Sequence, residues 1–172
     1  MLHKRSSVRS VSLTIRKSFA EGPNGRSEKG CSVSMHDVFA RRLRHLDEVL
    51  SILEQLSRTP LDVFLSNPEK YGSAERFLQI AIEVLDDLGA HLVSRRDAGP
   101  VDRYRDIPDR LEANDLISEA EARLWRNAIG FRNILVHNYL DVDRLVVYEI
   151  LTTRLEDLRS LMRTVVRAEE QA

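Results

Sequence analysis

Apolar residues recur at alternating spacings of four and three positions along most of this chain, and no other feature limits its possible folds so strongly. The clearest example begins just after His36 and ends before Pro60. Its members are Phe39, Leu43, Leu46, Leu50 and Leu53. On an α-helix this spacing gathers the side chains into one stripe, whereas a half-buried strand would show strict alternation. The pattern predicts helices that each bury one face, and no strand.

Residues that interrupt helices divide the first part of the pattern. The first long helix is expected to stop before Thr59-Pro60, because proline disfavours helix at the residue before it and can itself open a new turn. A second helix is expected over about 73–94, and Gly99-Pro100 ends that region. Residues 101–114 are polar and predict a short helix or turn over the end of the bundle.

Two further long helices are predicted in the second part. Ser118 and Glu121 have the spacing of a capping box, in which each side chain satisfies the other's free backbone amide at a helix start. A last helix, capped by Asp141 or Asp143, is expected to continue unbroken to the C-terminal tail. The predicted fold is therefore all-α, an antiparallel four-helix bundle with a short extra helix.

Residues 1–34 differ in composition from the rest of the chain. Seven basic and two acidic residues give them a net charge of +5, while residues 35–172, with 19 basic and 25 acidic residues, carry −6. We predict a disordered basic arm at 1–34 and a helical domain at 35–172. The arm has three possible origins: an RNA-binding extension, an organelle transit peptide, or a start assigned upstream of a true start at Met35. The acidic domain argues against a general nucleic-acid coat protein.

Composition also bounds the class of site. The single cysteine, Cys31, cannot form an internal disulfide, and no Cys or His cluster has the spacing of zinc ligands. No apolar run approaches the roughly 18 residues that span a bilayer. The expectation is a cytoplasmic protein that is not in a membrane and needs no metal ion or cofactor.

Chemistry is concentrated in the segment 131–139. It holds Arg132, Asn133, His137 and Tyr139 within an otherwise apolar helical pattern. A guanidinium can hold a phosphate, an imidazole can transfer a proton near neutral pH, and a tyrosine offers a modifiable hydroxyl. An arginine five residues before a histidine is common by chance, but adding the tyrosine lowers the expected number of matches to about 0.01. The segment suggests that the protein acts on a phosphodiester bond.

Helix geometry adds detail to this motif. Asn133 and His137 lie about 40° apart around a helix, so the amide can orient the ring, and Tyr139 lies within about 20° of Arg132. Arg132 and His137 are about 140° apart. One phosphate can lie between them only if the guanidinium wraps, the helix ends near His137, or a second subunit contributes. We favour a site at the interface between the two subunits of a symmetric homodimer.

Two interpretations of the surrounding charge remain. Arg123, Arg126 and Arg132 lie in a stretch without carboxylates, which predicts a local basic patch. In the alternative, Arg132 and His137 are ordinary helix residues satisfied by Asp141 and Asp143. The aromatic residues Trp125, Phe131 and Tyr148 are expected to be packing residues rather than a surface for stacking bases.

Several blocks of the chain, taken together, resemble a known family. They are Arg132-x4-His137-x-Tyr139, the segment Ala74-Glu75-Arg76-Phe77-Leu78-Gln79-Ile80-Ala81-Ile82-Glu83, Leu116-Ile117-Ser118 and Asp141-Val142-Asp143. In order and spacing they are similar to the HepT toxins of the HEPN superfamily, over about residues 36–168. The arm before Met35 is not part of that pattern.

The resemblance implies a function as well as a fold. It implies a dimeric HEPN bundle that acts as a metal-independent ribonuclease toxin on RNA, with tRNA as one candidate, and a partner antitoxin of the minimal nucleotidyltransferase (MNT) type. Arg132 would hold the scissile phosphate, His137 would transfer protons, Asn133 would assist, and Tyr139 would be the target of AMP addition. Two alternatives remain: a non-catalytic helical binding partner of a nucleotidyltransferase, and a purely structural bundle.

Overall fold

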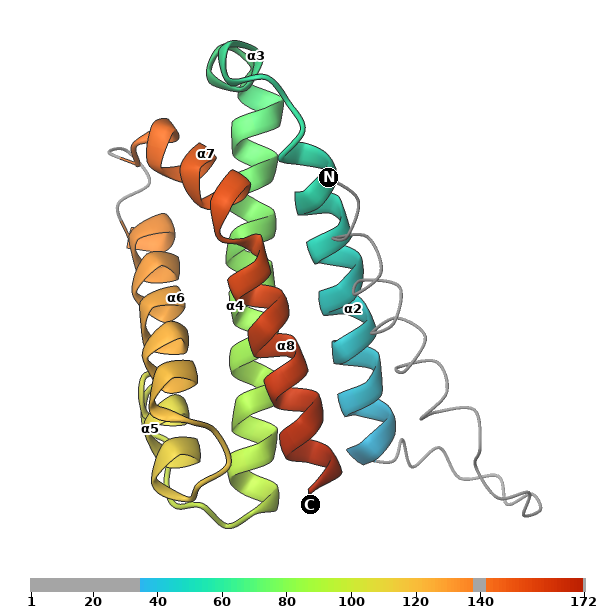
Figure 1. Ribbon diagram of the computed structural model, residues 1–172, viewed down its shortest axis with the longest axis vertical. Coiled ribbons are helices and arrows are strands. Elements are labelled where there is room, and N and C mark those ends of the chain that lie inside the picture. Colours follow the sequence, from blue (N-terminus) through green and yellow to red (C-terminus); the bar gives the residue numbers. More distant parts are fainter. Residues whose placement is uncertain (1–34, 138–141, 172) are drawn as a thin grey trace, which may run out of the picture. The chain divides into compact units, whose positions relative to one another are not determined.

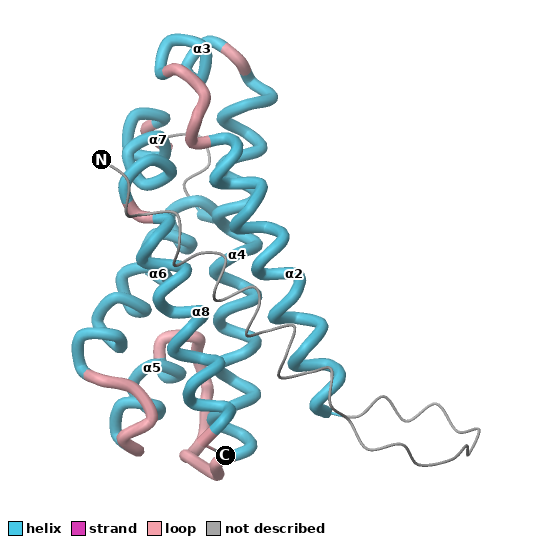
Figure 2. The backbone as a smooth tube through the Cα atoms, turned by 45° about the vertical axis from the view of Figure 1, so that its right-hand side comes forward, coloured by secondary structure: helices cyan, strands magenta, loops and turns pink. Residues whose placement is uncertain are grey.

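The computed structural model describes residues 35–137 and 142–171, which form seven α-helices. No strand occurs within these two ranges (Figure 2). The basic arm predicted at 1–34 lies outside the described residues, as do Tyr139 and Asp141. The origin of the arm therefore stays a prediction.

Four long helices run alternately in opposite directions and form the bundle (Figure 1). They are α2 (Met35–Leu56), α4 (Pro68–Arg95), α6 (Glu119–His137) and α8 (Leu155–Glu170). Three shorter helices connect them: α3 (Leu61–Ser66), α5 (Asp106–Ala113) and α7 (Arg144–Thr153). Helix α4 contacts each of the six other described helices, so it is the centre of the bundle. The predicted all-α antiparallel four-helix bundle is confirmed, and α5 is the short extra helix.

Two helix starts show how local sequence sets the boundaries. Glu121 and Ser118 form the predicted capping box: the Ser118 amide donates to Glu121 Oε2 at 2.8 Å, and the Glu121 amide donates to Ser118 Oγ at 3.3 Å. Helix α4 begins five residues before the predicted Ser73. There the Asn67 side chain accepts hydrogen bonds from the amides of residues 69 and 70, and Pro68 fills the first helical position.

The predicted last helix is in fact two helices. Arg154 leaves helical geometry (φ −115°, ψ 1°), and α7 lies across the end of the bundle while α8 runs along it (Figure 1). Just before the break, the hydroxyls of Thr152 and Thr153 donate to backbone carbonyls one turn earlier, at 2.8 and 2.7 Å. Such bonds compete with the helix and bend it. Asp143 caps α7 by accepting from the Leu145 amide at 2.8 Å.

The core is closed by an unusually close approach of α4 to its neighbours. Trp125 of α6 is fully buried, as predicted for a packing residue. It lies against Gly89 of α4, where a Cβ atom would come within 2.5 Å of Ile107 Cγ2 and 2.7 Å of Trp125 Cη2. Only a residue without a side chain fits there, so glycine sets how closely α5 and α6 pack on α4.

We therefore expect Gly89→Ala to lower the free energy of unfolding by about 1–3 kcal/mol through overpacking. The matched control is Gly130→Ala in α6, where an added Cβ meets no atom within 4 Å. That change should instead raise the free energy of unfolding by about 0.5–1 kcal/mol through better helix propensity. Urea unfolding followed by circular dichroism measures both values, and similar effects of the two changes would contradict the close approach.

Candidate functional site

Arg132 lies on the side of α6 that faces α4 and is mostly buried, with 17% of its side chain exposed. Its Nη2 donates a hydrogen bond to Glu83 Oε1 on α4 at 2.8 Å. Its Nη1 makes a longer contact of 3.4 Å to Asn133 Oδ1, and its buried Nε has no hydrogen-bond partner among the described residues. The guanidinium is thus held from one side and keeps unused donors.

Glu83 is the residue that fixes this arginine. The same Oε1 also accepts a hydrogen bond from Gln79 Nε2, one turn earlier on α4, at 2.9 Å. Burial alone would raise the pKa of Glu83, but the hydrogen bonds from Gln79 and Arg132 outweigh it and hold the pKa below its ordinary value. Glu83 is therefore a carboxylate at neutral pH, and its contact with Arg132 is a true ion pair.

Asp86 lies one turn further along α4 and is buried. Its Oδ1 accepts a hydrogen bond from Trp125 Nε1 at 2.9 Å, while its Oδ2 has no hydrogen-bond partner among the described residues. Burial raises the pKa of Asp86 to about 7, against the opposing influence of the Trp125 hydrogen bond and the charge of Arg132. Trp125 and Arg132 are seven residues apart and share one face of α6. Two α6 side chains therefore lie over two α4 carboxyl groups, one charged and one close to half-protonated at neutral pH.

Tyr104 completes the surroundings of Arg132. It lies in the connection between α4 and α5, and the Arg132 Cζ atom is over its ring at 5.5 Å from the centroid. The residue remains 48% exposed. A guanidinium over an aromatic face is a favourable cation–π contact. Neither Tyr104 nor Glu83 was predicted as a site residue: Glu83 appears only as the last residue of the block 74–83, and both lie far along the chain from Arg132.

The other motif residues lie near the end of the described part of α6. Asn133 and His137 are exposed, and His137 is the last described residue before the gap at 138–141. No hydrogen bond between Asn133 and His137 is found in the described structure, and Asn133 contacts Arg132 instead. Along the helix axis, Arg132 and His137 are separated by about 7.5 Å. No hydrogen bond joins these two side chains in the described part of the chain.

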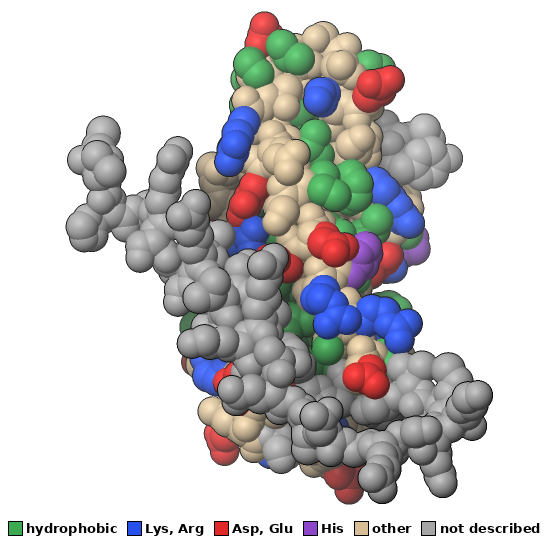
Figure 3. All heavy atoms as spheres, turned by 90° about the vertical axis from the view of Figure 1, so that its right-hand side faces the viewer, with side chains coloured by type: hydrophobic (Ala, Val, Ile, Leu, Met, Phe, Trp, Pro, Cys, Tyr) green, Lys and Arg blue, Asp and Glu red, His purple; other side chains and the backbone are tan. Residues whose placement is uncertain are grey.

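The prediction of an open basic patch on α6 is wrong. Arg126 is paired with Asp109 and Glu112 of α5 at 2.5 and 3.0 Å, Arg132 is paired with Glu83, and Arg123 lies 4.0 Å from Glu119. Most of these carboxylates come from other helices, so their approach could not be read from the α6 sequence. Asp143, one of the two carboxylates that the alternative interpretation offered as partners for Arg132 and His137, caps α7. Figure 3 shows the side of the molecule away from α6, and there too basic and acidic side chains of the described residues are intermixed.

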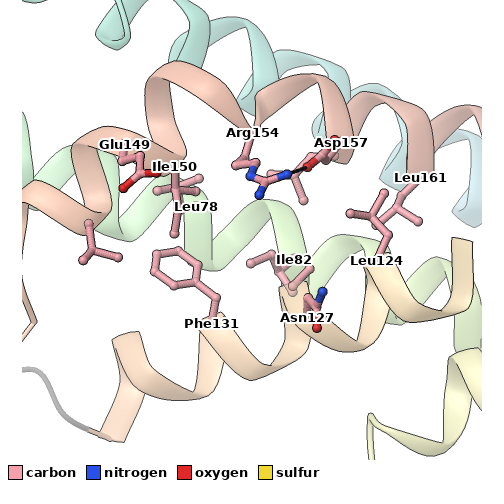
Figure 4. A pocket seen from close by; sticks show the side chains of 13 residues that line it. Leu78, Ile82, Leu124, Asn127, Phe131, Glu149, Ile150, Arg154, Asp157 and Leu161 are labelled. Carbon is pink, nitrogen blue, oxygen red and sulfur yellow. Dashed lines mark hydrogen bonds and ion pairs between the residues drawn. The ribbon is translucent and has the colours of Figure 1, made fainter. Parts of the chain in front are cut away.

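A groove of about 360 Å³ lies on another side of α6. Leu78 and Ile82 of α4 line it, and Phe131 points into it from α6 (Figure 4). The Arg154–Asp157 ion pair, 3.3 Å long, lies at its α7–α8 wall. Because Phe131 and Arg132 are consecutive, their side chains point about 100° apart. The groove is thus distinct from the surroundings of Arg132, and its largely apolar lining offers little acid–base chemistry.

Neither a metal site nor a membrane-spanning helix is found within the described ranges. No three His, Cys, Asp or Glu side chains are grouped there so as to bind a metal ion. None of the helices described is both long and apolar enough to cross a bilayer.

Comparison with known proteins identifies relatives. The model of the family described as Ribonuclease HepT-like matches residues 45–165. A protein named tRNA nuclease HepT, from Aphanizomenon flos-aquae, is 24% identical over 74% of this chain and 87% of its own length. A protein named Putative RNase, from Archaeoglobus fulgidus, is 30% identical over 71% of this chain and 87% of its own length.

A solved structure shows the same fold. It is that of the tri-AMPylated HEPN toxin of Shewanella oneidensis in complex with MNT antitoxin. The similarity covers 77% of this chain and 98% of that one, with a TM-score of 0.70 and 21% sequence identity. At that identity the comparison establishes a shared architecture, the HEPN bundle.

The buried carboxyl group predicts a specific pH dependence. The pKa of Asp86 is about 7 in the folded protein against an ordinary value of 3.8, so the folded state binds this proton more tightly than the unfolded state. Its contribution to stability is complete below about pH 4 and is lost as the pH rises through about 7. Asp86→Asn keeps an acceptor for Trp125 and cannot titrate. We expect it to be more stable than the wild type at pH 8, by an amount on the order of 1–4 kcal/mol, with little difference at pH 4.

Urea unfolding of both proteins across pH 4–8 measures this difference. Asp87→Asn, at the neighbouring half-exposed position paired with Arg42 at 3.4 Å, is the control for loss of one carboxylate from α4. A constant difference between wild type and Asp86→Asn over the whole pH range would contradict the assignment.

Proposed function

The chain belongs to the HepT-like ribonuclease family, and on that premise we propose that it is a toxin that cleaves RNA at a site built on Arg132 and His137. The observation that carries this proposal is the Arg132 guanidinium, which Glu83 and Tyr104 hold in a fixed, mostly buried position in the helix that also bears His137. A cation fixed before its substrate arrives loses little on reorganisation and stabilises developing negative charge strongly.

The proposed reaction needs only proton transfer and charge stabilisation. The ribose 2′-hydroxyl attacks the neighbouring phosphorus and its proton passes to the His137 imidazole. The bond from phosphorus to the 5′-oxygen breaks, and that oxygen takes up a proton, leaving a 2′,3′-cyclic phosphate and a 5′-hydroxyl end. Arg132 stabilises the charge on the phosphate oxygens through its remaining donors, and Asn133 assists by contacting the guanidinium. Because no step requires a metal ion, we propose that cleavage is metal-independent.

A homodimer is part of the proposal. The separation of Arg132 and His137 around and along α6 disfavours a phosphate shared within one protomer. Exposed apolar side chains are found on α6 and at the start of α7: Ile134, between the two motif residues in sequence, is 50% exposed, and Leu145 and Val146 are 53% and 45% exposed. A second copy that covers this surface would bring the His137 of one chain toward the Arg132 of the other.

Regulation through Tyr139 is also proposed. An antitoxin of the nucleotidyltransferase type would transfer AMP from ATP: the Tyr139 oxygen attacks the α-phosphorus, pyrophosphate leaves, and the hydroxyl proton is released. Two effects follow. The negative charge of the added phosphate competes with RNA for nearby cations, and the bulk of the nucleoside blocks the site. Support comes from the motif spacing and from the AMPylated, antitoxin-bound Shewanella protein of the same fold.

The substrate and the setting are proposed from relatives. tRNA is the first substrate to test, because the Aphanizomenon relative is named a tRNA nuclease. We place the activity in the cytoplasm, where that substrate is found. One observation favours a second candidate function, a non-catalytic helical partner of a nucleotidyltransferase: the charge of Arg132 is already neutralised by Glu83.

Cleavage assays separate these functions. We expect the full chain to cut RNA in the presence of EDTA, and Arg132→Lys and His137→Ala to lower the rate by about a hundredfold or more. Arg123→Lys is the control, because it makes the same change at an exposed position of the same helix. Mapping the RNA ends after induced expression identifies the target. Cleavage by His137→Ala at the wild-type rate would exclude the assigned role, and a folded wild type that binds a nucleotidyltransferase but cuts no RNA would favour the second function.

The regulatory proposal has its own test. Incubation with the cognate nucleotidyltransferase and ATP should add the mass of AMP to the wild type and abolish cleavage. Tyr139→Phe should stay unlabelled. Tyr71→Phe is the control: Tyr71 lies on α4 with Arg144 of α7 over its ring, and this variant should be labelled like the wild type. Intact-mass spectrometry measures the modification. Equal labelling of Tyr139→Phe would show that another side chain is modified.

A further inference from the structure

Two arginines that are free to bind RNA lie in the connection between α4 and α5, close in sequence to a ring that contacts Arg132. Arg103 and Arg105 are exposed and form no ion pair with any described residue, in contrast to Arg126 and Arg132. Tyr104 lies between them, with its ring beside the Arg132 guanidinium. The segment 103–105 therefore presents a cation, an aromatic ring and a second cation in direct sequence next to the proposed phosphate site.

The backbone of this segment is fixed. The Asp106 carboxylate accepts hydrogen bonds from the amides of Asp102 and Arg103 at 3.0 and 2.8 Å, and the Ile107 amide donates to the Tyr104 carbonyl at 3.2 Å. These bonds tie the segment to the first turn of α5. A ring on a fixed backbone loses less freedom when it binds a ligand than one on a mobile loop.

The Tyr104 side chain is not explained by packing. It is 48% exposed, and its hydroxyl makes no hydrogen bond within the described structure, whereas the Tyr148 hydroxyl donates to the Thr59 carbonyl at 2.9 Å. Trp125 is fully buried and Phe131 faces the groove, so neither can meet a base beside Arg132. Among the described aromatic residues, Tyr104 is the one with a ring both at Arg132 and open to solvent.

A further positive charge lies on the same side of α4. Arg76 is exposed, has no ion pair with a described residue, and its charge contributes to lowering the pKa of Glu83. It therefore lies within electrostatic reach of the carboxylate that holds Arg132. Glu83 neutralises one guanidinium, while Arg76, Arg103 and Arg105 keep the surroundings attractive to a polyanion; the exposed Asp102 offsets part of this charge.

Building on the ribonuclease function proposed above, we propose that residues 103–105 are an RNA-binding element, in which Tyr104 stacks on the base next to the phosphate at Arg132. Arg103 and Arg105 contact the flanking phosphates. Stacking on an aromatic ring works with any base, so this element contributes affinity for single-stranded RNA and little sequence preference.

Binding can be measured apart from cleavage with a short fluorescent 2′-O-methyl RNA of mixed sequence, which lacks the attacking hydroxyl. We expect Tyr104→Ala in the full chain to weaken binding by about five- to a hundredfold. Tyr104→Phe should bind like the wild type, and Tyr104→Leu, which keeps apolar contact with Arg132 but not the ring, should bind like Tyr104→Ala. Removing both Arg103 and Arg105 should make the affinity less dependent on salt.

Tyr71→Ala is the matched control, since it removes another ring under an arginine, Arg144, at 3.9 Å from the centroid. Circular dichroism confirms that each variant is folded. Binding of Tyr104→Leu as tight as that of Tyr104→Phe, or a wild type that binds no RNA, overturns the proposal. If binding depends on Tyr104 but natural RNA is not cleaved, the ribonuclease function is wrong and the RNA-binding element stands. If RNA is cleaved but binding does not depend on Tyr104, the RNA-binding element is wrong and the ribonuclease function stands.

Discussion

The contact between Trp125 and helix α4 is the constraint on which the bundle and the site both depend. Gly89 lets the indole approach the α4 backbone, and Asp86 accepts its N–H at 2.9 Å. This buried bond fixes both the rotation and the height of α6 against α4. Arg132 follows Trp125 by seven residues, close to two helical turns, and Glu83 precedes Asp86 by one turn. The same registration that closes the core therefore delivers the guanidinium to Glu83.

A consequence is that stability and site chemistry share residues. Glu83 and Asp86 lie one turn apart on α4 but differ in protonation, because Glu83 receives two hydrogen bonds whereas burial dominates at Asp86. Removing Arg132 would leave the half-buried Glu83 carboxylate without its cation, so part of any loss would be structural. The ion pair also weakens the binding of substrate at Arg132, since a phosphate must compete with the Glu83 carboxylate for the guanidinium.

Much of the fold could be predicted from the sequence because its determinants are local. The stripe from Phe39 to Leu53 and the Ser118–Glu121 capping box each depend on residues a few positions apart. The break at Arg154 was missed because the apolar spacing continues across it. The motif residues could be picked out, but their partners could not. Glu83 is 49 positions from Arg132, and Asp109 and Glu112 reach Arg126 only after α5 folds against α6. Tyr104 gave no periodic signal because it lies in a loop.

The central place of α4 determines the order in which a newly made chain can bury its surfaces. Helices α2 and α4 can pair as soon as both have left the ribosome, and α6 can then add the Arg132 contact. Helix α8, the sixteen-residue helix that is the last of those described, also packs against α4, and its Thr164 and Arg167 bond to Glu121 of α6 at 2.7 and 3.0 Å. Until residues 155–170 have been synthesised, the nascent bundle exposes apolar surface next to an almost complete site. Synthesis of residues 155–170 is thus the step that converts an aggregation-prone intermediate into a folded domain.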